Sequence, residues 1–240
     1  MAHSRPLLRT LFFKDRILVA VLLLVSITAL PYTLILFWAD FHVTPVAKEM
    51  HYYAKRTGSI PTIEEYQRFK NTLDASLEIT ADNPQYKELK ARLLLLALPH
   101  AVNKNKHLND MLELHRQASF ERPFWGVSSA NLVFIKSKLL QYDDEYSGAL
   151  LNAIKRAPWE PYVIQKVVAS GITLWPYLSN KEKNLIAETA KRGLKLNALN
   201  LAVTIRRTII KDRQATEFIC NKITFKNRNI RKRWCESTKP

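Results

Sequence analysis

Residues 153–161 read Ala-Ile-Lys-Arg-Ala-Pro-Trp-Glu-Pro, the end of one amphipathic segment and the start of another. A proline removes a backbone donor and clashes with the preceding turn, so Pro158 ends the first helix. Pro161 is favourable in the first turn of a helix and begins the next one. The small side chain of Ala153, just before the break, lets the next helix pack closely. This stretch therefore predicts two helices joined by a short turn, which makes them antiparallel neighbours.

Similar joints recur at residues 76–84, 118–126 and 193–201. Each opens with a small residue followed by Pro or Ala, and the small residues of successive joints are 42, 35 and 40 residues apart. A small residue late in one helix, then a turn and a new helix, is similar to the joint of tetratricopeptide repeats. The pattern predicts an all-α domain of tetratricopeptide-like helical hairpins. A non-repetitive helical domain, in which proline simply ends helices, is the alternative.

Short capping motifs place the starts of several helices. Residues 62–65 and 179–182 have the spacing of a capping box, and Asn83 before Pro84 is typical of an N-cap followed by the first helical residue. Combined with apolar residues at helical spacing, these motifs predict helices over residues 46–57, 62–80, 84–98, 105–118, 127–141, 144–157, 161–177, 181–196 and 199–218.

The N-terminal part of the chain predicts a membrane anchor. Residues 17–38 are 22 consecutive uncharged residues, ILVAVLLLVSITALPYTLILFW, about enough to cross a hydrocarbon core of about 30 Å. A signal peptide has a shorter apolar region, so we expect an uncleaved transmembrane helix. Residues 1–16 carry four basic residues against one acid, which predicts a cytoplasmic N-terminus. For a bacterium this gives a single-pass inner-membrane protein with a periplasmic C-terminal domain.

The two cysteines, Cys220 and Cys235, are compatible with that location. In an oxidising compartment they are candidates for a disulfide, which would close a loop of about 15 residues and stabilise the fold by roughly 3 kcal/mol. Two unpaired thiols are the alternative. A zinc site is disfavoured because no other Cys or His lies nearby in the sequence.

The composition excludes some classes of function. The chain has 240 residues, 47% of them hydrophobic, but only five glycines. Phosphate-binding loops and dinucleotide fingerprints need several glycines close together, so nucleotide chemistry of those kinds is not expected. Neither the histidines His100, His107 and His115 nor the acids of residues 143–145 have the spacing of a metal or catalytic site, and the acids are better placed to cap a helix. We therefore expect no catalytic site, no metal and no cofactor.

Two surface features remain as candidate binding residues. Trp125, Trp159 and Trp175 lie beside prolines at the joints, where aromatic rings either contact a ligand or fill the seams between hairpins. The C-terminal segment from residue 206 carries eleven of the basic residues against three acids. Basic residues interleaved with apolar ones suit an anionic glycan or lipid headgroup, while a solvated tail is the alternative. The candidate anionic-ligand patch consists of Lys222, Lys226, Arg228, Arg231, Lys232 and Arg233.

Residues 122–139, 149–161 and 171–175 resemble bacterial VpsP-type polysaccharide biosynthesis proteins. The similarity covers roughly residues 120–195, and the chain departs from the family by its lysine content and by Gly126, where a more regular helix start is expected. The resemblance implies a single N-terminal anchor and a helical, tetratricopeptide-like domain outside the cytoplasm. It implies structural roles for Pro158, Trp159, Pro161 and Trp175 and supplies no catalytic residues.

Together these features predict a cytoplasmic segment (1–16), a transmembrane helix (17–38), an extracytoplasmic helical-repeat domain (39–205) and a basic C-terminal segment (206–240). The expected function is that of an accessory or scaffold protein in surface or exopolysaccharide biosynthesis, with the lipid bilayer and a polysaccharide polymerase, ligase or co-polymerase as partners. The alternatives are a structural subunit of another envelope membrane complex and an enzyme acting on a lipid-linked glycan. Nucleic acid is expected as a partner only if the domain is cytoplasmic.

Overall fold

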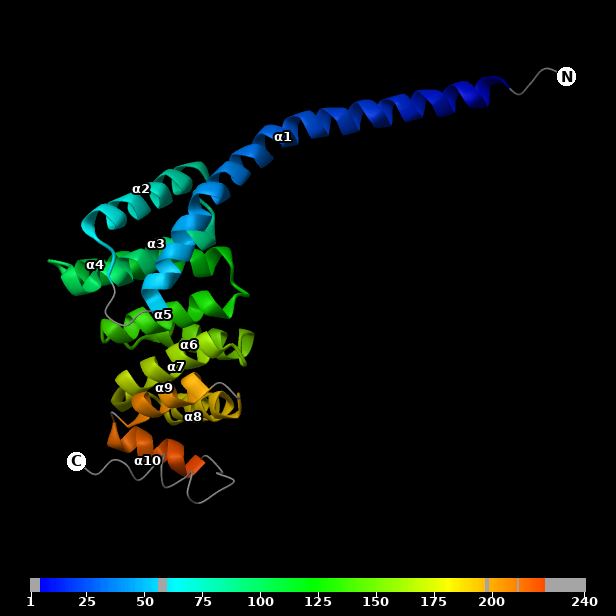
Figure 1. Cartoon of the computed structure of the whole chain (residues 1–240). Helices are drawn as coiled ribbons and strands as arrows, with labels where there is room; N and C mark the ends of the chain where they lie inside the picture. Colours follow the sequence, from blue (N-terminus) through cyan, green and yellow to red (C-terminus); the bar gives the residue numbers. More distant parts are fainter. Residues whose placement is uncertain (1–4, 56–59, 197–198, 211, 223–240) are drawn as a thin grey trace.

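The computed structural model describes residues 5–55, 60–196, 199–210 and 212–222, and these residues contain helices and no strand. Figure 1 shows a long N-terminal helix leading into a stack of shorter ones. The helices are α1 (Arg5–Lys55), α2 (Ile63–Ile79), α3 (Pro84–Ala97), α4 (Lys104–Glu121), α5 (Gly126–Lys138), α6 (Asp144–Arg156), α7 (Pro161–Thr173), α8 (Asn180–Lys195), α9 (Leu199–Ile209) and α10 (Arg213–Lys222), with 3-10 turns η1 (Leu98–His100) and η2 (Trp175–Tyr177). The all-α prediction is confirmed.

The predicted helix starts are confirmed by their caps. The Thr62 side chain accepts from the backbone of Glu65, whose carboxylate accepts from the backbone of Thr62, and Ser179 and Glu182 form the same reciprocal pair. The Asn83 side chain accepts from the backbone of the first turn of α3. Because each cap satisfies donors that a helix end leaves unpaired, these positions are determined locally.

The first predicted helix, 46–57, is wrong as a separate element. It is the end of α1, which continues through Pro31 and Pro45 as one helix of 51 residues. The second half of α1 buries Ala39, Val43, Val46 and Met50 against α2 and α3. This continuous apolar contact outweighs the hydrogen bond that Pro45 removes from the helix.

Three other predicted helices are shorter in the structure. Helix 127–141 ends at Lys138, since Leu140 has a φ of 56°, a left-handed conformation that turns the chain. Helix 161–177 ends at Thr173, because a residue before a proline such as Pro176 disfavours the helical conformation. Helix 199–218 is two helices, with Asp212 capping α10 by accepting from the backbone of Ala215 at 2.8 Å.

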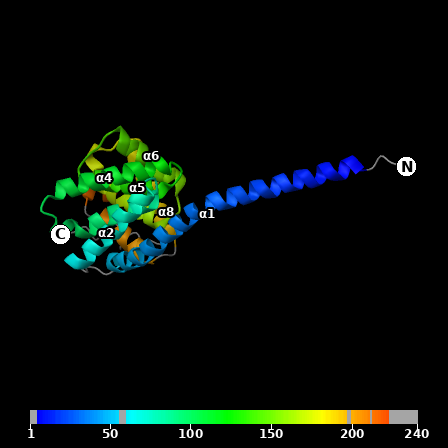
Figure 2. The same ribbon diagram turned by 90° about the horizontal axis from the view of Figure 1, so that it is seen from above.

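Successive helices lie side by side in antiparallel hairpins, and their connections form two opposite edges of the stack (Figures 1 and 2). We call the edge formed by residues 80–83, 122–125 and 157–160 the joint edge, and we include in it the adjoining helix ends with Glu78, Phe120, Lys155 and Arg156. In both views it faces the side on which α1 leaves the stack. Residues 98–103, 139–143 and 174–179 form the opposite edge.

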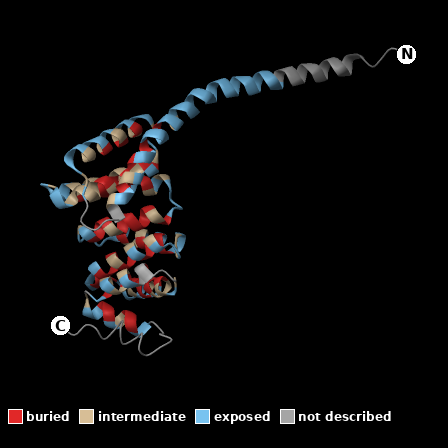
Figure 3. Cartoon of the chain, in the orientation of Figure 1, coloured by how far each residue is buried: buried red, intermediate tan, exposed pale blue. Residues whose placement is uncertain are grey.

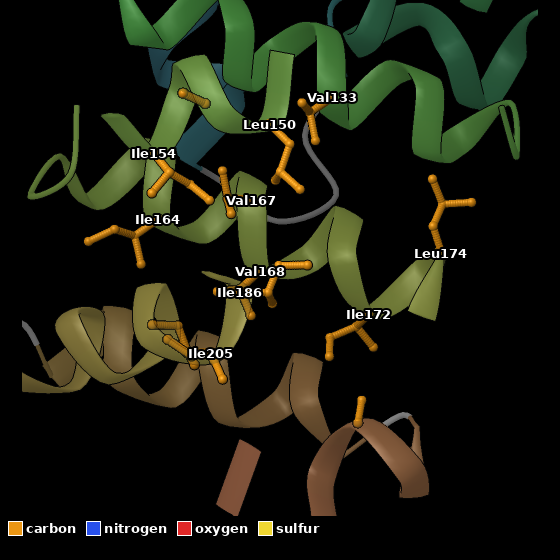
Figure 4. Close-up of a cluster of buried hydrophobic side chains, with 14 of the residues drawn as sticks. Val133, Leu150, Ile154, Ile164, Val167, Val168, Ile172, Leu174, Ile186 and Ile205 are labelled. Atoms are coloured by element: carbon orange, nitrogen blue, oxygen red, sulfur yellow. The ribbon is translucent and has the colours of Figure 1, made fainter. Parts of the chain in front are cut away.

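The core runs through the whole stack (Figure 3). One cluster joins α1, α2 and α3, a second joins α3, α4 and α5, and the largest extends from α5 to α10. Figure 4 shows the largest cluster, in which Val167 and Val168 of α7 lie among side chains from the neighbouring helices. Central helices such as α5 and α7 are therefore buried on more than one side.

The small residue of each predicted joint is buried where helices approach one another. Ser76, Ala118 and Ala153 have at most 1% of their surface exposed, and Gly193 is also buried. Close packing also explains why position 126 is a glycine. A Cβ atom there would lie 2.8 Å from the Cβ of Ala157 and 3.0 Å from its backbone nitrogen. The helix start that the sequence leaves unexplained is thus a close approach of α5 to the α6–α7 connection.

Candidate functional site

The first half of α1 is a continuous exposed apolar surface. Its described side chains from residue 18 to residue 38 are exposed, apart from Leu36, which is partly covered. By length and composition α1 is long and apolar enough to cross a membrane. The exposed rings of Tyr32, Trp38 and Phe41 lie near the end of this surface, and Trp38 stacks on His42 with ring centroids 4.3 Å apart. Aromatic rings at the end of an apolar helix are typical of a membrane–water interface.

A hydrogen bond joins α1 to the stack just beyond this surface. The Tyr86 hydroxyl at the start of α3 donates to Oδ1 of Asp40 over 2.6 Å. Burial, together with the neighbouring carboxylate, raises the pKa of Tyr86. The ion pair between Arg68 and Glu49 adds a second link, from α2. These contacts hold the stack in a fixed position on the long helix.

The three predicted tryptophans have different environments. Trp175 is buried, with its ring edge-on to Phe218 at 5.5 Å, and it therefore packs between helices. Trp125 and Trp159 are 36% and 56% exposed on the joint edge. The guanidinium of Arg122 lies 5.1 Å from the Trp125 ring. Packing accounts for Trp175 and leaves the other two rings available to a partner.

Most of the predicted basic patch lies outside the described residues. Lys222 is the last residue of α10, with its ammonium 5.8 Å from the Phe218 ring. Lys226, Arg228, Arg231, Lys232 and Arg233 are not described. Cys220 is buried in α10, whereas Cys235 lies outside the described residues. The disulfide and the anionic-ligand patch stay predictions.

The structure contains a buried polar cluster that the sequence analysis missed. The Asn131 amide donates to Oε2 of Glu88 over 2.6 Å, and Nδ1 of His115 lies 3.2 Å from the same oxygen. The Tyr162 hydroxyl donates to Oδ1 of Asn131, also over 2.6 Å. Burial raises the pKa of Glu88, but the contacts from His115 and Asn131 outweigh it and hold the pKa below its usual range. The cluster thus joins α3, α4, α5 and α7 through polar contacts.

Lys166 of α7 lies at the edge of this cluster. Its ammonium is 3.3 Å from the centroid of the Phe134 ring. Burial lowers the pKa of Lys166 to about 7, and the positive charges of Lys138 and Arg92 act in the same direction. Favourable contact with a ring face opposes this shift. It does not cancel the cost of removing a lone ammonium from water.

The volume of the cavity within the cluster limits what the cluster can hold. The cavity has a volume of about 20 Å³ and is lined by Glu88, Arg92, His115, Asn131, Tyr162 and Lys166, among others. A cavity of this size holds about one water molecule. The arrangement therefore ties four helices together around a water-sized space and has no room for a substrate. The sequence signal that could have marked it is Asn131, a polar residue among the apolar Ala130, Leu132 and Val133 of α5.

Replacing Tyr146 or Tyr162 with phenylalanine tests how much each tyrosine hydroxyl contributes to the stability of the protein. Tyr146 is fully buried, and its hydroxyl has no hydrogen-bond partner among the described residues. We expect Tyr146→Phe to stabilise the protein by about 1 kcal/mol, since it removes an unpaired buried group. Tyr162→Phe should destabilise by about 1 kcal/mol, because it leaves Oδ1 of Asn131 without its donor. Denaturant unfolding in detergent micelles measures both, and a shift in the same direction would contradict this assignment.

The acidic residues 143–145 cap α6, as predicted. The Asp143 side chain accepts from the backbone of Tyr146 at 2.9 Å. The buried ammonium of Lys136 lies 2.6 Å from both Asp143 and Glu145. Arg116 and Lys136 together lower the pKa of Glu145 to about 2. His115 belongs to the buried cluster, whereas His100 and His107 line a separate surface groove.

A second groove lies beside Trp159, with a volume of about 740 Å³. Lys155 and Arg192 line it together with apolar side chains, including Leu151 and Leu185. The joint edge thus combines exposed rings with cationic side chains.

Comparison of the chain with protein-family models, with curated proteins and with solved structures finds no match.

Proposed function

We propose that this chain is a single-pass membrane protein of the bacterial envelope and that its helical domain acts as a scaffold in surface-polysaccharide assembly. The observation that carries the proposal is the continuity of α1. Its first half exposes apolar side chains along its length, and its second half is buried against α2 and α3. A helix with these two halves supports the role of an anchor that positions the stack at the membrane surface.

The stack is suited to binding partner proteins. Stacked helical hairpins present an extended surface, and each hairpin is held mainly by its neighbours. The role in polysaccharide assembly follows from the resemblance of residues 122–139 and 149–161 to VpsP-type proteins. A polymerase, ligase or co-polymerase in the same membrane is the proposed partner.

The proposed orientation has the N-terminus in the cytoplasm and the helical domain in the periplasm. The basic residues before the apolar stretch support this direction. Burial of Cys220 is compatible with a disulfide to Cys235, which the oxidising periplasm would maintain.

Topology tests the proposal directly. A reporter enzyme that is active only outside the cytoplasm is fused after Pro240, and Cys220 and Cys235 are labelled with a thiol reagent without reduction. We expect an active reporter and two blocked thiols that become reactive after reduction and unfolding. A silent reporter with two reactive thiols would place the domain in the cytoplasm and overturn the proposal.

Co-purification from detergent-solubilised membranes distinguishes the scaffold role from the two alternative functions. Enrichment of polysaccharide polymerase, ligase or co-polymerase subunits supports the proposed role. Stable association with a different membrane complex would instead identify a structural subunit of that complex. Turnover of lipid-linked glycan by the purified protein would identify an enzyme and contradict the scaffold proposal.

A further inference from the structure

The joint edge carries an unusual group of exposed rings. Phe120 and Phe124 are 87% and 71% exposed, and Trp159 is 56% exposed. Exposed rings also occur on the opposite edge, at Tyr142 and Tyr177, but those of the joint edge are more numerous and lie beside arginines. A contiguous group of large exposed rings indicates an interaction surface. The arrangement of the hairpins places this edge on the side where α1 leaves the stack (Figure 1).

A groove between α1 and the α2–α3 connection brings part of the joint edge next to the exposed apolar surface of α1. Tyr32 and Leu36 of α1 line it together with residues 78–84 and Arg122, and its volume is about 530 Å³. Tyr32 and Leu36 lie in the last two turns of the uncharged stretch 17–38. If that stretch crosses the bilayer, the α2–α3 connection and Arg122 are at the level of the lipid headgroups.

Cationic side chains accompany the rings. The guanidinium of Arg156 lies 4.5 Å from the centroid of the Phe124 ring, so the second and third joints are in contact. Arg122 makes the equivalent contact with Trp125 at 5.1 Å. Arginine binds phosphate oxygens through its planar fork while it stacks on an aromatic face. Rings and arginines together are suited to the boundary between headgroups and acyl chains.

Acidic residues are outnumbered by basic ones at the second and third joints, where the exposed rings lie. Glu78 and Asp82 belong to the first joint, which is nearest to α1, and Glu160 belongs to the third. Glu121 is paired with Lys87 and does not offer a free charge to a ligand. The attraction for anionic groups therefore comes from the second and third joints, where Arg122, Lys155 and Arg156 lie.

We propose that the joint edge lies on the headgroup layer of the bilayer that α1 crosses, with its rings among the lipids and its arginines on anionic headgroup phosphates. This inference rests on the proposed membrane anchor and adds a second membrane contact to it. The stack then lies against the membrane along its joint edge. Its opposite edge and its helix faces are left for partner proteins.

Site-specific photocrosslinking in the full-length protein tests the contact. Benzoylphenylalanine replaces one residue at a time in protein reconstituted into nanodiscs that contain a tritiated phospholipid. Phe124 and Trp159 report on the joint edge. Tyr177, which is 63% exposed on the opposite edge, is the matched control, and Val25 reports on the anchor. We expect lipid labelling at Val25, Phe124 and Trp159, and at least tenfold less labelling at Tyr177.

The outcomes separate the two proposals. Labelling at Val25 with only the Tyr177 level at Phe124 and Trp159 would overturn the membrane-contact inference and leave the anchor intact. Loss of labelling at Val25 as well would contradict the anchor, and with it this inference.

Charge reversal tests the role of the arginines. In nanodiscs that contain phosphatidylglycerol, Arg122→Glu and Arg156→Glu should each reduce labelling at Phe124 by at least about fivefold, because the loss of one basic residue at an anionic surface has about this effect and the new carboxylate adds repulsion. Lys104→Glu, in the first turn of α4 next to the opposite edge, should leave the labelling unchanged. Equal labelling for the arginine variants and the wild type would contradict the assignment of these side chains to headgroup phosphates.

Discussion

Replacing Gly126 with alanine is expected to destabilise the protein by about 2 kcal/mol, the middle of the range for overpacking a close contact. The new Cβ would lie 2.8 Å from the Cβ of Ala157 and 3.2 Å from the backbone oxygen of Ala153. One of these contacts is to backbone, so relief requires a shift of α5 against the end of α6. The gain of alanine over glycine in a helix is smaller than this cost.

Gly148 provides a matched control. It lies within α6, and a Cβ there would have no atom within 4 Å. Gly148→Ala should therefore stabilise the protein by about 0.5 to 1 kcal/mol, since alanine loses less backbone entropy than glycine. Denaturant unfolding in the same detergent compares the two variants. The contact assigned to Gly126 would be wrong if both replacements stabilised the protein to a similar extent.

Lys166→Met is expected to stabilise the protein by about 2 to 4 kcal/mol at neutral pH, the scale of a buried unpaired ammonium. The side chain is largely buried, its ammonium lies over the Phe134 ring, and no carboxylate forms an ion pair with it among the described residues. Lys138 and Arg92 add repulsion, and only Glu88 attracts it. Methionine keeps the volume of the stem and needs no charge.

The effect has a characteristic pH dependence. The pKa of Lys166 is about 7 in the folded protein and 10.5 for an unperturbed lysine. Between these values the unfolded chain binds more protons than the folded one, so wild-type stability rises with pH. The penalty is complete below pH 7 and is lost as the pH approaches 10.5. The advantage of Lys166→Met should therefore be largest at and below neutral pH and shrink towards pH 10.

Lys222→Met is the matched control, because Lys222 is exposed and its ammonium also lies near an aromatic ring, that of Phe218, at 5.8 Å. Its effect should be within about 0.5 kcal/mol, as for other surface positions. Unfolding curves at a series of pH values give the result. A stability difference between Lys166→Met and wild type that stayed constant from pH 6 to pH 10 would show that Lys166 keeps an ordinary pKa.

Local signals in the sequence determined most of the helix boundaries. The capping boxes at 62–65 and 179–182 and the Asn83 cap involve residues within one turn, so their chemistry is readable without knowing the fold. The prediction of a separate helix over residues 46–57 failed because distant contacts decided the outcome. Burial of Val43 and Met50 against the stack carries α1 through Pro45, which is a helix-ending signal when read locally.

The buried cluster could not be predicted because its members are far apart in the chain. Glu88 and Asn131 are 43 residues apart, and Tyr162 lies 31 residues further on. The sequence places each on a helix but does not give the rotation of one helix against another. The expectation that the histidines form no metal site rested on spacing alone, and spacing gave no indication that His115 lies 3.2 Å from a buried glutamate.

By itself, the sequence determined that the chain is all-α, that its joints contain small residues and prolines, and that one segment is apolar enough to cross a membrane. These properties depend on neighbouring residues and on composition. Only the tertiary structure decided that α1 continues into the stack, that Gly126 is a close contact, and that Phe124, Trp159 and two arginines share one edge beside α1. Side chains from separate hairpins meet only when helices pack, and their relative positions depend on that packing rather than on local sequence.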